Sequence, residues 1–260
     1  MRRQKPYVIF LDIDGTLYTT EAGIPQENID AIHQVRQEGH MVLVNTGRSY
    51  ANIPVSIMES VPLDGAVSAL GSDVRIGGEQ LHSCIFSPDQ LYMITEYFLS
   101  EKRYCVLEGE EEVFVINPRK VDSKVPISSP DDFVTLYPNA RINILAARGV
   151  VTDREKELFG DDFFHYQHDR YYECALRGNS KSRGMEMIMN HLGLTRQDSI
   201  AIGDSLNDVD MLQYAGLSIA MEDAHDKVKE VCDAITYTAE QAGVAAALRK
   251  YVLEKEYSYI

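Results

Sequence analysis

The sequence feature that most constrains this chain is a short apolar run near its N-terminus that ends in two closely spaced aspartates. Residues 7–11 are apolar without interruption, and Asp12, Asp14 and Gly15 follow them. Such a run is typical of a strand that is covered on both faces, as in a parallel sheet. Open α/β sheets bind ligands beyond the carboxyl ends of their strands. The stretch therefore predicts two carboxylates, able to hold a hard divalent cation, at the ligand-binding edge of a sheet.

The Asp-x-Asp-Gly pattern also has two simpler interpretations. Asp and Gly are common in surface turns, because both suit turn geometry. An Asp-x-Asp-x-Asp-Gly loop would indicate Ca²⁺, but Thr16 and Tyr18 stand at the following ligand positions and the twelfth position holds no Glu. The apolar strand before Asp12 also disfavours a helix-loop-helix calcium site. We therefore treat the stretch as a candidate active site whose partners must come from elsewhere in the chain.

The overall charge and the cysteine spacing disfavour several classes of protein. The 260 residues carry 25 Lys and Arg against 40 Asp and Glu, which gives a formal net charge of −15. This balance disfavours a nucleic-acid surface, but it permits a small phosphorylated ligand that is bound through a local cation or metal. The four cysteines form no Cys-x-x-Cys pair, no apolar run reaches membrane-spanning length, and the MRRQK start lacks the apolar region of a signal peptide. We expect a cytoplasmic protein without nucleic-acid or membrane partners.

The segment after the two aspartates predicts a βαβ unit that brings a second polar loop to the same sheet edge. Apolar residues at helical spacing over 29–35 are followed by an apolar strand at 41–44, which leads into Thr46. Because the strands of such a unit are parallel, Thr46 leaves the sheet at the same edge as Asp12. The next predicted elements are a helix over 50–59, limited by Pro54, and a strand over 65–70.

The middle of the chain predicts a separate α/β unit, because its element order differs from the alternation on either side. Helices are predicted over 90–99 and 153–159, and strands over 104–107, 113–116, 141–146, 163–168 and 171–176. Gly109 and three glutamates between the first two strands indicate a hairpin. This order is typical of a small unit with an antiparallel sheet. We interpret His165 and His168 as structural, since we identify no acid or thiol partner for them.

The alternating pattern returns after residue 178 and brings two more polar groups to the same edge. Lys181 precedes an amphipathic helix, and the strand over 199–204 ends at Asp204. Asn207 and Asp208 could cap the helix that follows, but capping does not explain an acid at a strand end. Further elements are predicted as a strand over 217–221 and helices over 185–192, 209–212, 224–232 and 241–252. We expect one sheet edge to collect Asp12, Asp14, Thr46, Lys181 and Asp204.

Together these motifs resemble the haloacid dehalogenase-like superfamily of aspartate-nucleophile phosphohydrolases, specifically its Cof-like branch (type IIB) with a large inserted cap. DIDGT at 12–16, TGR at 46–48, Lys181 and GDSLND at 203–208 match the four family motifs in order and spacing. One such match has little specificity, whereas four in order, each at its expected strand or helix end, are specific. The resemblance implies an α/β fold. Its Rossmann-like parallel-sheet core would span 1–82 and 178–260, and an α/β cap would be inserted at 83–177.

The resemblance also implies a role for each residue of the set. Asp12 would attack phosphorus, and Asp14 would act as general acid and base. Mg²⁺ would bind Asp12, the backbone carbonyl of Asp14 and Asp204. Thr46 and Lys181 would assist catalysis, and phosphate oxygens would be held by Ile13, Thr46, Gly47, Arg48, Lys181 and Asn207. Asp208 would orient Lys181 or a water on the metal, and Arg48 could equally be a structural salt-bridge partner near the cap.

An acid at position 14 separates phosphatases from the related cation-pumping ATPases, which carry Thr there. We therefore expect a Mg²⁺-dependent phosphatase of small phosphorylated metabolites, such as sugar, flavin or pyridoxal phosphates. A phosphosugar mutase of the same fold is one alternative, and a non-catalytic phosphometabolite-binding module is another. Leu70 stands where relatives often carry Asn, so the contacts near the cap entrance stay open. The physiological substrate and the oligomeric state stay open too, and a monomer is compatible with the sequence.

Overall fold

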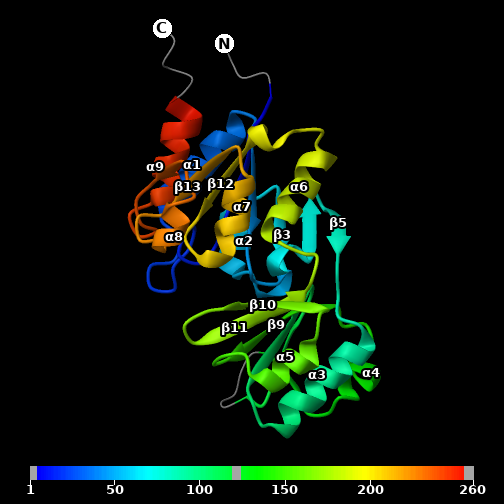
Figure 1. Ribbon diagram of the computed structural model, residues 1–260. Helices are drawn as coiled ribbons and strands as arrows, with labels where there is room; N and C mark the ends of the chain where they lie inside the picture. Colours follow the sequence, from blue (N-terminus) through cyan, green and yellow to red (C-terminus); the bar gives the residue numbers. More distant parts are fainter. Residues whose placement is uncertain (1–4, 119–123, 255–260) are drawn as a thin grey trace.

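The protein folds into two β-sheets covered by helices, and the chain of the smaller sheet is inserted within that of the larger one (Figure 1). The computed structural model describes residues 5–118 and 124–254. Residues 1–4, which belong to the MRRQK start, lie outside these ranges. Within them, no helix is both long and apolar enough to cross a membrane. We call the larger sheet with its helices the core unit, and the smaller sheet with its helices the cap unit.

The core unit is built on an eight-stranded sheet with the order β14-β13-β12-β1-β2-β3-β4-β5. The pairs from β14 to β3 are all parallel, which confirms the predicted parallel-sheet α/β core. These strands are β1 (Val8–Leu11), β2 (Met41–Asn45), β3 (Gly65–Ser68), β12 (Ser199–Gly203), β13 (Leu217–Ala220) and β14 (Ala234–Ile235). The sheet continues at one edge into an antiparallel hairpin of β4 (Asp73–Ile76) and β5 (Glu79–Ser83), which we did not predict.

Among the described residues, six α-helices belong to the core unit, and four of them form two packed pairs. The six are α1 (Gln26–Gln37), α2 (Val55–Ser60), α6 (Lys181–His191), α7 (Val209–Tyr214), α8 (Asp226–Lys229) and α9 (Gly243–Leu248). Helix α1 packs against α9, and α6 packs against α7. The predicted helix over 50–59 is divided, with a 3₁₀ turn at Tyr50–Asn52 and α2 after Pro54. Proline lacks a backbone N–H and keeps the preceding residue extended, so one continuous helix cannot form there.

The cap unit has a six-stranded sheet with the order β10-β11-β9-β6-β7-β8 and an apolar core of its own. Its strands are β6 (Cys105–Gly109), β7 (Val113–Ile116), β8 (Val125–Ile127), β9 (Ile142–Arg148), β10 (Phe163–Gln167) and β11 (Tyr171–Leu176). Its helices are α3 (Pro88–Ser100), α4 (Asp132–Thr135) and α5 (Asp153–Phe159). The antiparallel pairing of β6 with β7 is the predicted hairpin. The short elements β8 and α4 carry too few residues for a periodic signal, and we did not predict them.

The cap unit lies beyond the carboxyl ends of the parallel strands (Figure 1). A small apolar cluster joins it to the core unit there. Ala69 and Leu70, directly after β3, pack with Ile144 of β9 and Ala175 of β11. Both residues after β3 have positive φ, 49° for Ala69 and 55° for Leu70, so the strand predicted over 65–70 ends at Ser68. Leu70 is almost fully buried. In this chain the position is therefore an apolar contact between the two units.

Candidate active site

The loops after β1, β2 and β12 meet because the registers of these strands place their last residues side by side. Leu11 pairs with Val44 of β2 and with Ile202 of β12. Asp12 follows Leu11, and its backbone amide donates to the carbonyl of Ile202 at 3.0 Å. The side chain of Asn45 donates to the carbonyl of Lys181 at 3.2 Å, which ties the start of α6 to the end of β2. Segments from both ends of the sequence thus form one site.

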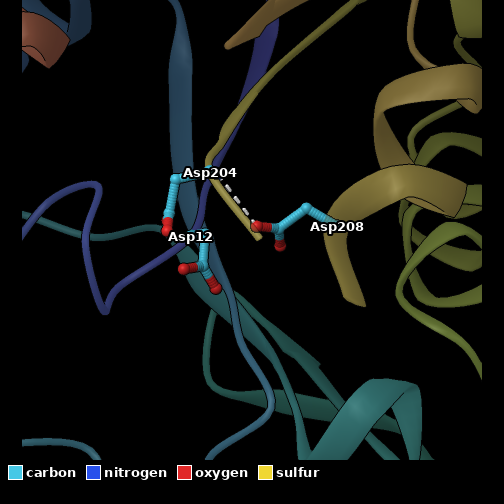
Figure 2. A group of neighbouring side chains, drawn as sticks. All are labelled: Asp12, Asp204 and Asp208. Carbon is cyan, nitrogen blue, oxygen red and sulfur yellow. Dashed lines mark hydrogen bonds between the residues drawn. The ribbon is translucent and has the colours of Figure 1, made fainter. Parts of the chain in front are cut away.

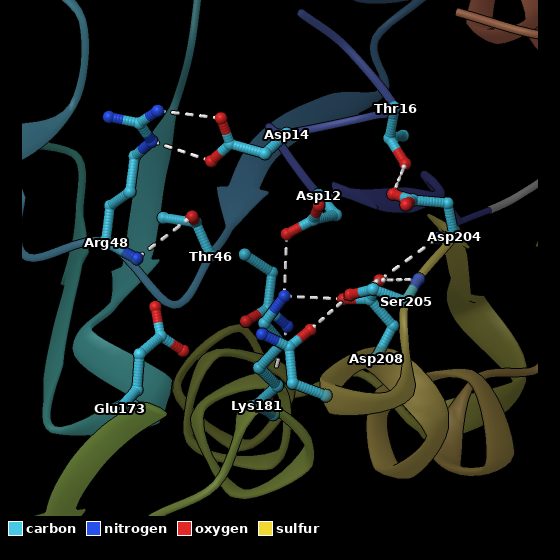
Figure 3. Close-up of polar contacts among 12 residues, drawn as sticks. Asp12, Asp14, Thr16, Thr46, Arg48, Glu173, Lys181, Asp204, Ser205 and Asp208 are labelled. Atoms are coloured by element: carbon cyan, nitrogen blue, oxygen red, sulfur yellow. Dashed lines mark hydrogen bonds and ion pairs between the residues drawn. The ribbon is translucent and has the colours of Figure 1, made fainter. Parts of the chain in front are cut away.

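The Lys181 ammonium is buried between two carboxylates (Figure 3). Its Nζ donates to Oδ1 of Asp12 at 2.6 Å and to Oδ1 of Asp208 at 2.5 Å. Burial alone would lower the pKa of Lys181, but the charges of Asp12 and Asp208 outweigh it and hold the pKa above its ordinary value. Lys181 is therefore a permanent cation beside the carboxylate that ends β1.

Three carboxylates lie close together at this point, and two of them are the partners of the Lys181 ammonium (Figure 2). Oxygen atoms of Asp12, Asp204 and Asp208 lie within 4.8 Å of one another. The approach depends on Gly15, where φ is +82° and a Cβ would lie 2.6 Å from Oδ2 of Asp204. Thr16 fixes the same carboxylate, since its Oγ1 donates to Oδ1 of Asp204 at 2.8 Å. One ammonium among three ionised carboxylates leaves an excess of two negative charges.

This crowding raises the pKa of two of the carboxyl groups. Burial is the largest cause for Asp12, and the charge of Asp208 adds to it, so the pKa of Asp12 lies well above its ordinary value. Burial and the charge of Asp208 also raise the pKa of Asp204 to about 7. A divalent cation between these groups would offset both the repulsion and the excess charge.

The donor set fits Mg²⁺, which prefers carboxylate, carbonyl and water oxygens. Asp208 is engaged elsewhere, because its Oδ1 accepts from Lys181 and its Oδ2 accepts from two backbone amides of the loop after β12, at 3.0 and 2.9 Å. Asp12 and Asp204 are then the side chains of the cluster that are left to bind a cation. The backbone carbonyl of Asp14 stays the predicted third protein ligand.

The Asp14 carboxylate binds Arg48 instead of joining this cluster (Figure 3). Nε and Nη2 of Arg48 donate to its two oxygens, each at 2.7 Å. Arg48 also donates from Nη1 to the carbonyl of Asn52 at 3.1 Å, and the hydrogen bond to Asp14 raises the pKa of Arg48. Arg48 thus has a salt-bridge partner in the predicted acid, Asp14, and its contact with a phosphate oxygen stays a prediction.

A cavity of about 430 Å³ lies between the core unit and the cap unit at this edge. The core unit lines it with Asp12, Asp14, Thr46, Gly47, Arg48, Asn52, Ser205 and Asn207. Thr46 is almost fully buried, and its Oγ1 accepts from the amide of Arg48 at 3.2 Å. Asn207 accepts at Oδ1 from the Ser205 hydroxyl at 2.6 Å. Ile13 has a fully buried side chain, so its backbone alone is available to a ligand.

The cap unit forms the other wall of the cavity, which the sequence analysis missed. Its lining residues are Glu108, Ala146, His168, Tyr171 and Glu173. Nε2 of His168 lies 3.2 Å from Oε2 of Glu173, and its ring stacks on Tyr171 with a centroid separation of 4.3 Å. The interpretation of His168 as a residue without an acid partner was therefore wrong. The alternation of residues along a strand could have predicted this wall. Tyr171 and Glu173 share one face of β11, while the buried Tyr172 and Cys174 share the other.

Comparison with known proteins shows that nearly the whole chain is similar to one family of hydrolases. The family model of haloacid dehalogenase-like hydrolases matches residues 9–248. The 5-amino-6-(5-phospho-D-ribitylamino)uracil phosphatase YcsE of Bacillus subtilis is 28% identical over 255 residues, covering 95% of this chain and 96% of the relative. The phosphatase YitU of the same species, named for the same substrate, is 26% identical and covers 95% and 98%. The chloroplastic endoribonuclease YBEY of Arabidopsis thaliana is 26% identical, but this chain spans only 46% of its length.

Solved structures share the architecture of both units. The sugar phosphatase BT4131, of subclass IIB, superposes with a TM-score of 0.80 at 21% identity and covers 94% of this chain and 98% of its own. BT1666 of Bacteroides thetaiotaomicron superposes with a TM-score of 0.77 at 23% identity and covers 94% of each chain. At these identities the likeness concerns the fold. With the family match and the fold in agreement, the chain belongs to the haloacid dehalogenase-like hydrolases and has their Cof-like fold.

Proposed function

We propose that this protein is a Mg²⁺-dependent phosphatase that hydrolyses small phosphorylated metabolites through an aspartyl phosphate on Asp12. One observation carries the proposal: the Asp12 carboxylate lines a cavity of about 430 Å³ while a buried ammonium and two further carboxylates surround it. Family membership and the phosphatase names of YcsE and YitU support the reaction class.

Asp12 supplies the nucleophile in this proposal. One oxygen of its carboxylate attacks phosphorus, and the bond from phosphorus to the leaving oxygen breaks as the aspartyl phosphate forms. Lys181 holds Oδ1 of Asp12 at 2.6 Å and offsets the negative charge that a phosphate brings. Thr46, the Gly47 amide and Asn207 line the same cavity and would hold phosphate oxygens. Phosphoryl transfer depends mainly on such positioning and charge neutralisation.

Asp14 would move the proton. In its acid form it protonates the leaving oxygen, so that the product leaves as an alcohol. As a carboxylate it then takes a proton from the water that attacks the aspartyl phosphate, and inorganic phosphate is released. Arg48 holds Asp14 at the cavity wall, where the side chain of Asp14 is 51% exposed. In the acid step one oxygen of Asp14 would face the leaving oxygen while the other stays paired with Arg48.

Mg²⁺ would be held by Asp12, Asp204 and the backbone carbonyl of Asp14. When bound, the ion supplies positive charge against the phosphoryl oxygens as negative charge develops on them. When its three carboxylates are ionised, the cluster of Asp12, Asp204, Asp208 and Lys181 carries an excess of two negative charges, which supports a divalent ion.

We propose sugar or polyol phosphates as the first substrates to test. BT4131 is named a sugar phosphatase, and YcsE and YitU are named for a phosphorylated ribityl compound. A cavity of about 430 Å³ has room for a ligand of this size. The cap unit would cover the site and contact the leaving group. A cytoplasmic location and the absence of nucleic-acid and membrane partners stay predictions.

Phosphate release from a panel of phosphorylated metabolites, with Mg²⁺ and with EDTA, tests the proposal. We expect release with Mg²⁺, none from Asp12→Asn, and turnover lowered about 10²- to 10⁴-fold in Asp14→Asn with phosphate binding retained. Asp161→Asn changes an exposed aspartate of the cap unit and should match the wild type. Near-normal turnover by Asp14→Asn contradicts the assigned proton transfer. Binding of Mg²⁺ without phosphate release from any compound favours a binding module. Transfer of the phosphoryl group back to a sugar, in a reaction that requires a bisphosphate activator, favours a mutase.

A further inference from the structure

The cap wall of the cavity is acidic at the point closest to the predicted phosphate loop. The carboxylate of Glu173 lies directly over Gly47, since a Cβ on Gly47 would stand 2.9 Å from its Oε2 and 3.1 Å from its Oε1. The side chain of Glu173 is only 12% exposed. A leaving group attached to a phosphate at Gly47 therefore meets Glu173 in a largely desolvated setting.

The carboxylate of Glu108, the second acid of this wall, already accepts hydrogen bonds from the core unit. Its Oε2 accepts from the amide of Ser49 at 3.2 Å and from the side chain of Asn52 at 3.0 Å. Burial raises the pKa of Glu108 above its ordinary value, and the hydrogen bonds from Ser49 and Asn52 only partly oppose this. Glu108 thus serves as an acceptor between the units, and Glu173 is the acid that is left to face a ligand.

Positive charge on the walls of the cavity is already paired. Among the described lining residues, the side chains that can carry a positive charge are Arg48 and His168. Arg48 is held by both oxygens of Asp14, and His168 contacts Glu173. The ring of His168 stacks on Tyr171 at an interplanar angle of 13°, which fixes it beside Oε2 and leaves Oε1 of Glu173 for a ligand donor. A second anion on the leaving group would find no free cation among these residues.

We propose that Glu173, positioned by His168, determines specificity by accepting hydroxyl or amine donors of the leaving group and by rejecting leaving groups that carry a second anion. The inference rests on the proposed phosphatase function and names its substrate class: phosphomonoesters of neutral polyols or amino polyols. A like charge placed against a desolvated carboxylate lowers affinity by at least about tenfold.

Three open-chain hexitol derivatives phosphorylated at carbon 6 test this, because they differ at carbon 1 alone. Glucitol 6-phosphate carries an alcohol there, 1-amino-1-deoxyglucitol 6-phosphate an amine, and 6-phosphogluconate a carboxylate. Each is measured as a competitive inhibitor of p-nitrophenyl phosphate hydrolysis, which reports its affinity whether or not it is turned over. For the wild type we expect the carboxylate compound to bind at least about tenfold more weakly than the alcohol, and the amine to bind as well or better.

The variant Glu173→Gln keeps the size of the side chain and removes its charge. We expect the ratio of the carboxylate to the alcohol inhibition constant to fall toward one, while the exposed control Glu157→Gln keeps the wild-type ratio. An unchanged ratio in Glu173→Gln overturns the inference. The wild-type ratio is itself decisive if the variant does not fold, because equal affinity for all three compounds overturns the inference without any variant. Failure to release phosphate from p-nitrophenyl phosphate and from every metabolite of the panel with Mg²⁺ would instead overturn the proposed function.

Discussion

Replacing Lys181 by Met should destabilise the protein strongly, because this residue holds two carboxylates in a buried site. Its ammonium donates to Asp12 at 2.6 Å and to Asp208 at 2.5 Å, and its side chain is fully buried. Met has a similar length but no charge, so the variant leaves both acids without their cation. Removing one partner of a buried ion pair costs about 3–5 kcal/mol. We expect a loss of this size in the free energy of unfolding near neutral pH.

The size of this loss should depend on pH in a defined direction. Burial already raises the pKa of Asp12 in the native protein, and Lys181 opposes that shift. Without Lys181 the pKa rises further, so the folded variant binds protons that the unfolded chain releases. Stability then falls as pH rises between the unfolded and folded pKa values. The penalty of Lys181→Met should therefore be smaller near pH 5 than near pH 8.

Urea unfolding of the metal-free proteins, followed by far-UV circular dichroism, measures both effects. Lys227→Met, at an exposed lysine, should stay within about 0.5 kcal/mol of the wild type. Adding Asp208→Asn to Lys181→Met removes one of the two unpaired charges and should restore part of the loss. Equal stability of Lys181→Met and the wild type across pH 5–8, or a penalty that grows toward low pH, would refute the buried ion-pair network.

Three further predictions concern the same cavity. The pKa of Asp204 is raised to about 7, so Mg²⁺ must displace a proton from it at lower pH, and the affinity for Mg²⁺ should rise with pH up to about pH 8. Calorimetry in buffers of different ionisation enthalpy detects the released proton, and a Mg²⁺ affinity that does not change with pH contradicts the prediction. Gly47→Ala puts a Cβ 2.9 Å from the Glu173 carboxylate and should lower kcat/KM about 10- to 100-fold, with recovery in the double variant that also carries Glu173→Ala. Arg48→Lys loses the two-point contact to Asp14 and should lower kcat about tenfold with little change in KM. A rise in KM as large as the fall in kcat would assign Arg48 to substrate binding.

The parts of the site that the sequence predicted are those with a local cause. An apolar run predicts β1, and the residue after a parallel strand has to leave the sheet at its carboxyl edge, so Asp12 and Asp204 could be placed together from strand ends alone. Lys181 could be added because it stands at the start of an amphipathic helix. In each case a few neighbouring residues determine where the side chain stands in its element. The pairing of Leu11 with Val44 and Ile202 then brings the ends of the three strands together.

The features that the sequence did not predict depend on pairings between polar side chains that form only in the folded chain. Strand β4 was missed because Asp73 and Arg75 give it two charges in four residues, although Asp73 is fully buried and accepts from Arg75 at 3.0 Å and from Gln80 at 2.9 Å. A buried charge is tolerable only with such partners, and no local pattern reports them. The pair of Asp14 and Arg48 is likewise visible only after the fold brings β1 and β2 together.

The core wall of the cavity would bind an anion and the cap wall would repel one. The difference follows from the positions of the cations. At the core wall, Lys181 and a divalent ion would together balance Asp12, Asp204 and Asp208, so the phosphate group meets compensated charge. At the cap wall, His168 is the only side chain among the described lining residues that contacts Glu173 and can carry a positive charge. The chain as a whole carries a net charge of −15, and such a field is screened beyond about 8 Å at physiological ionic strength. Selection between anions must therefore be made at contact distance, where a phosphate can be accepted at one wall and a second anion refused at the other.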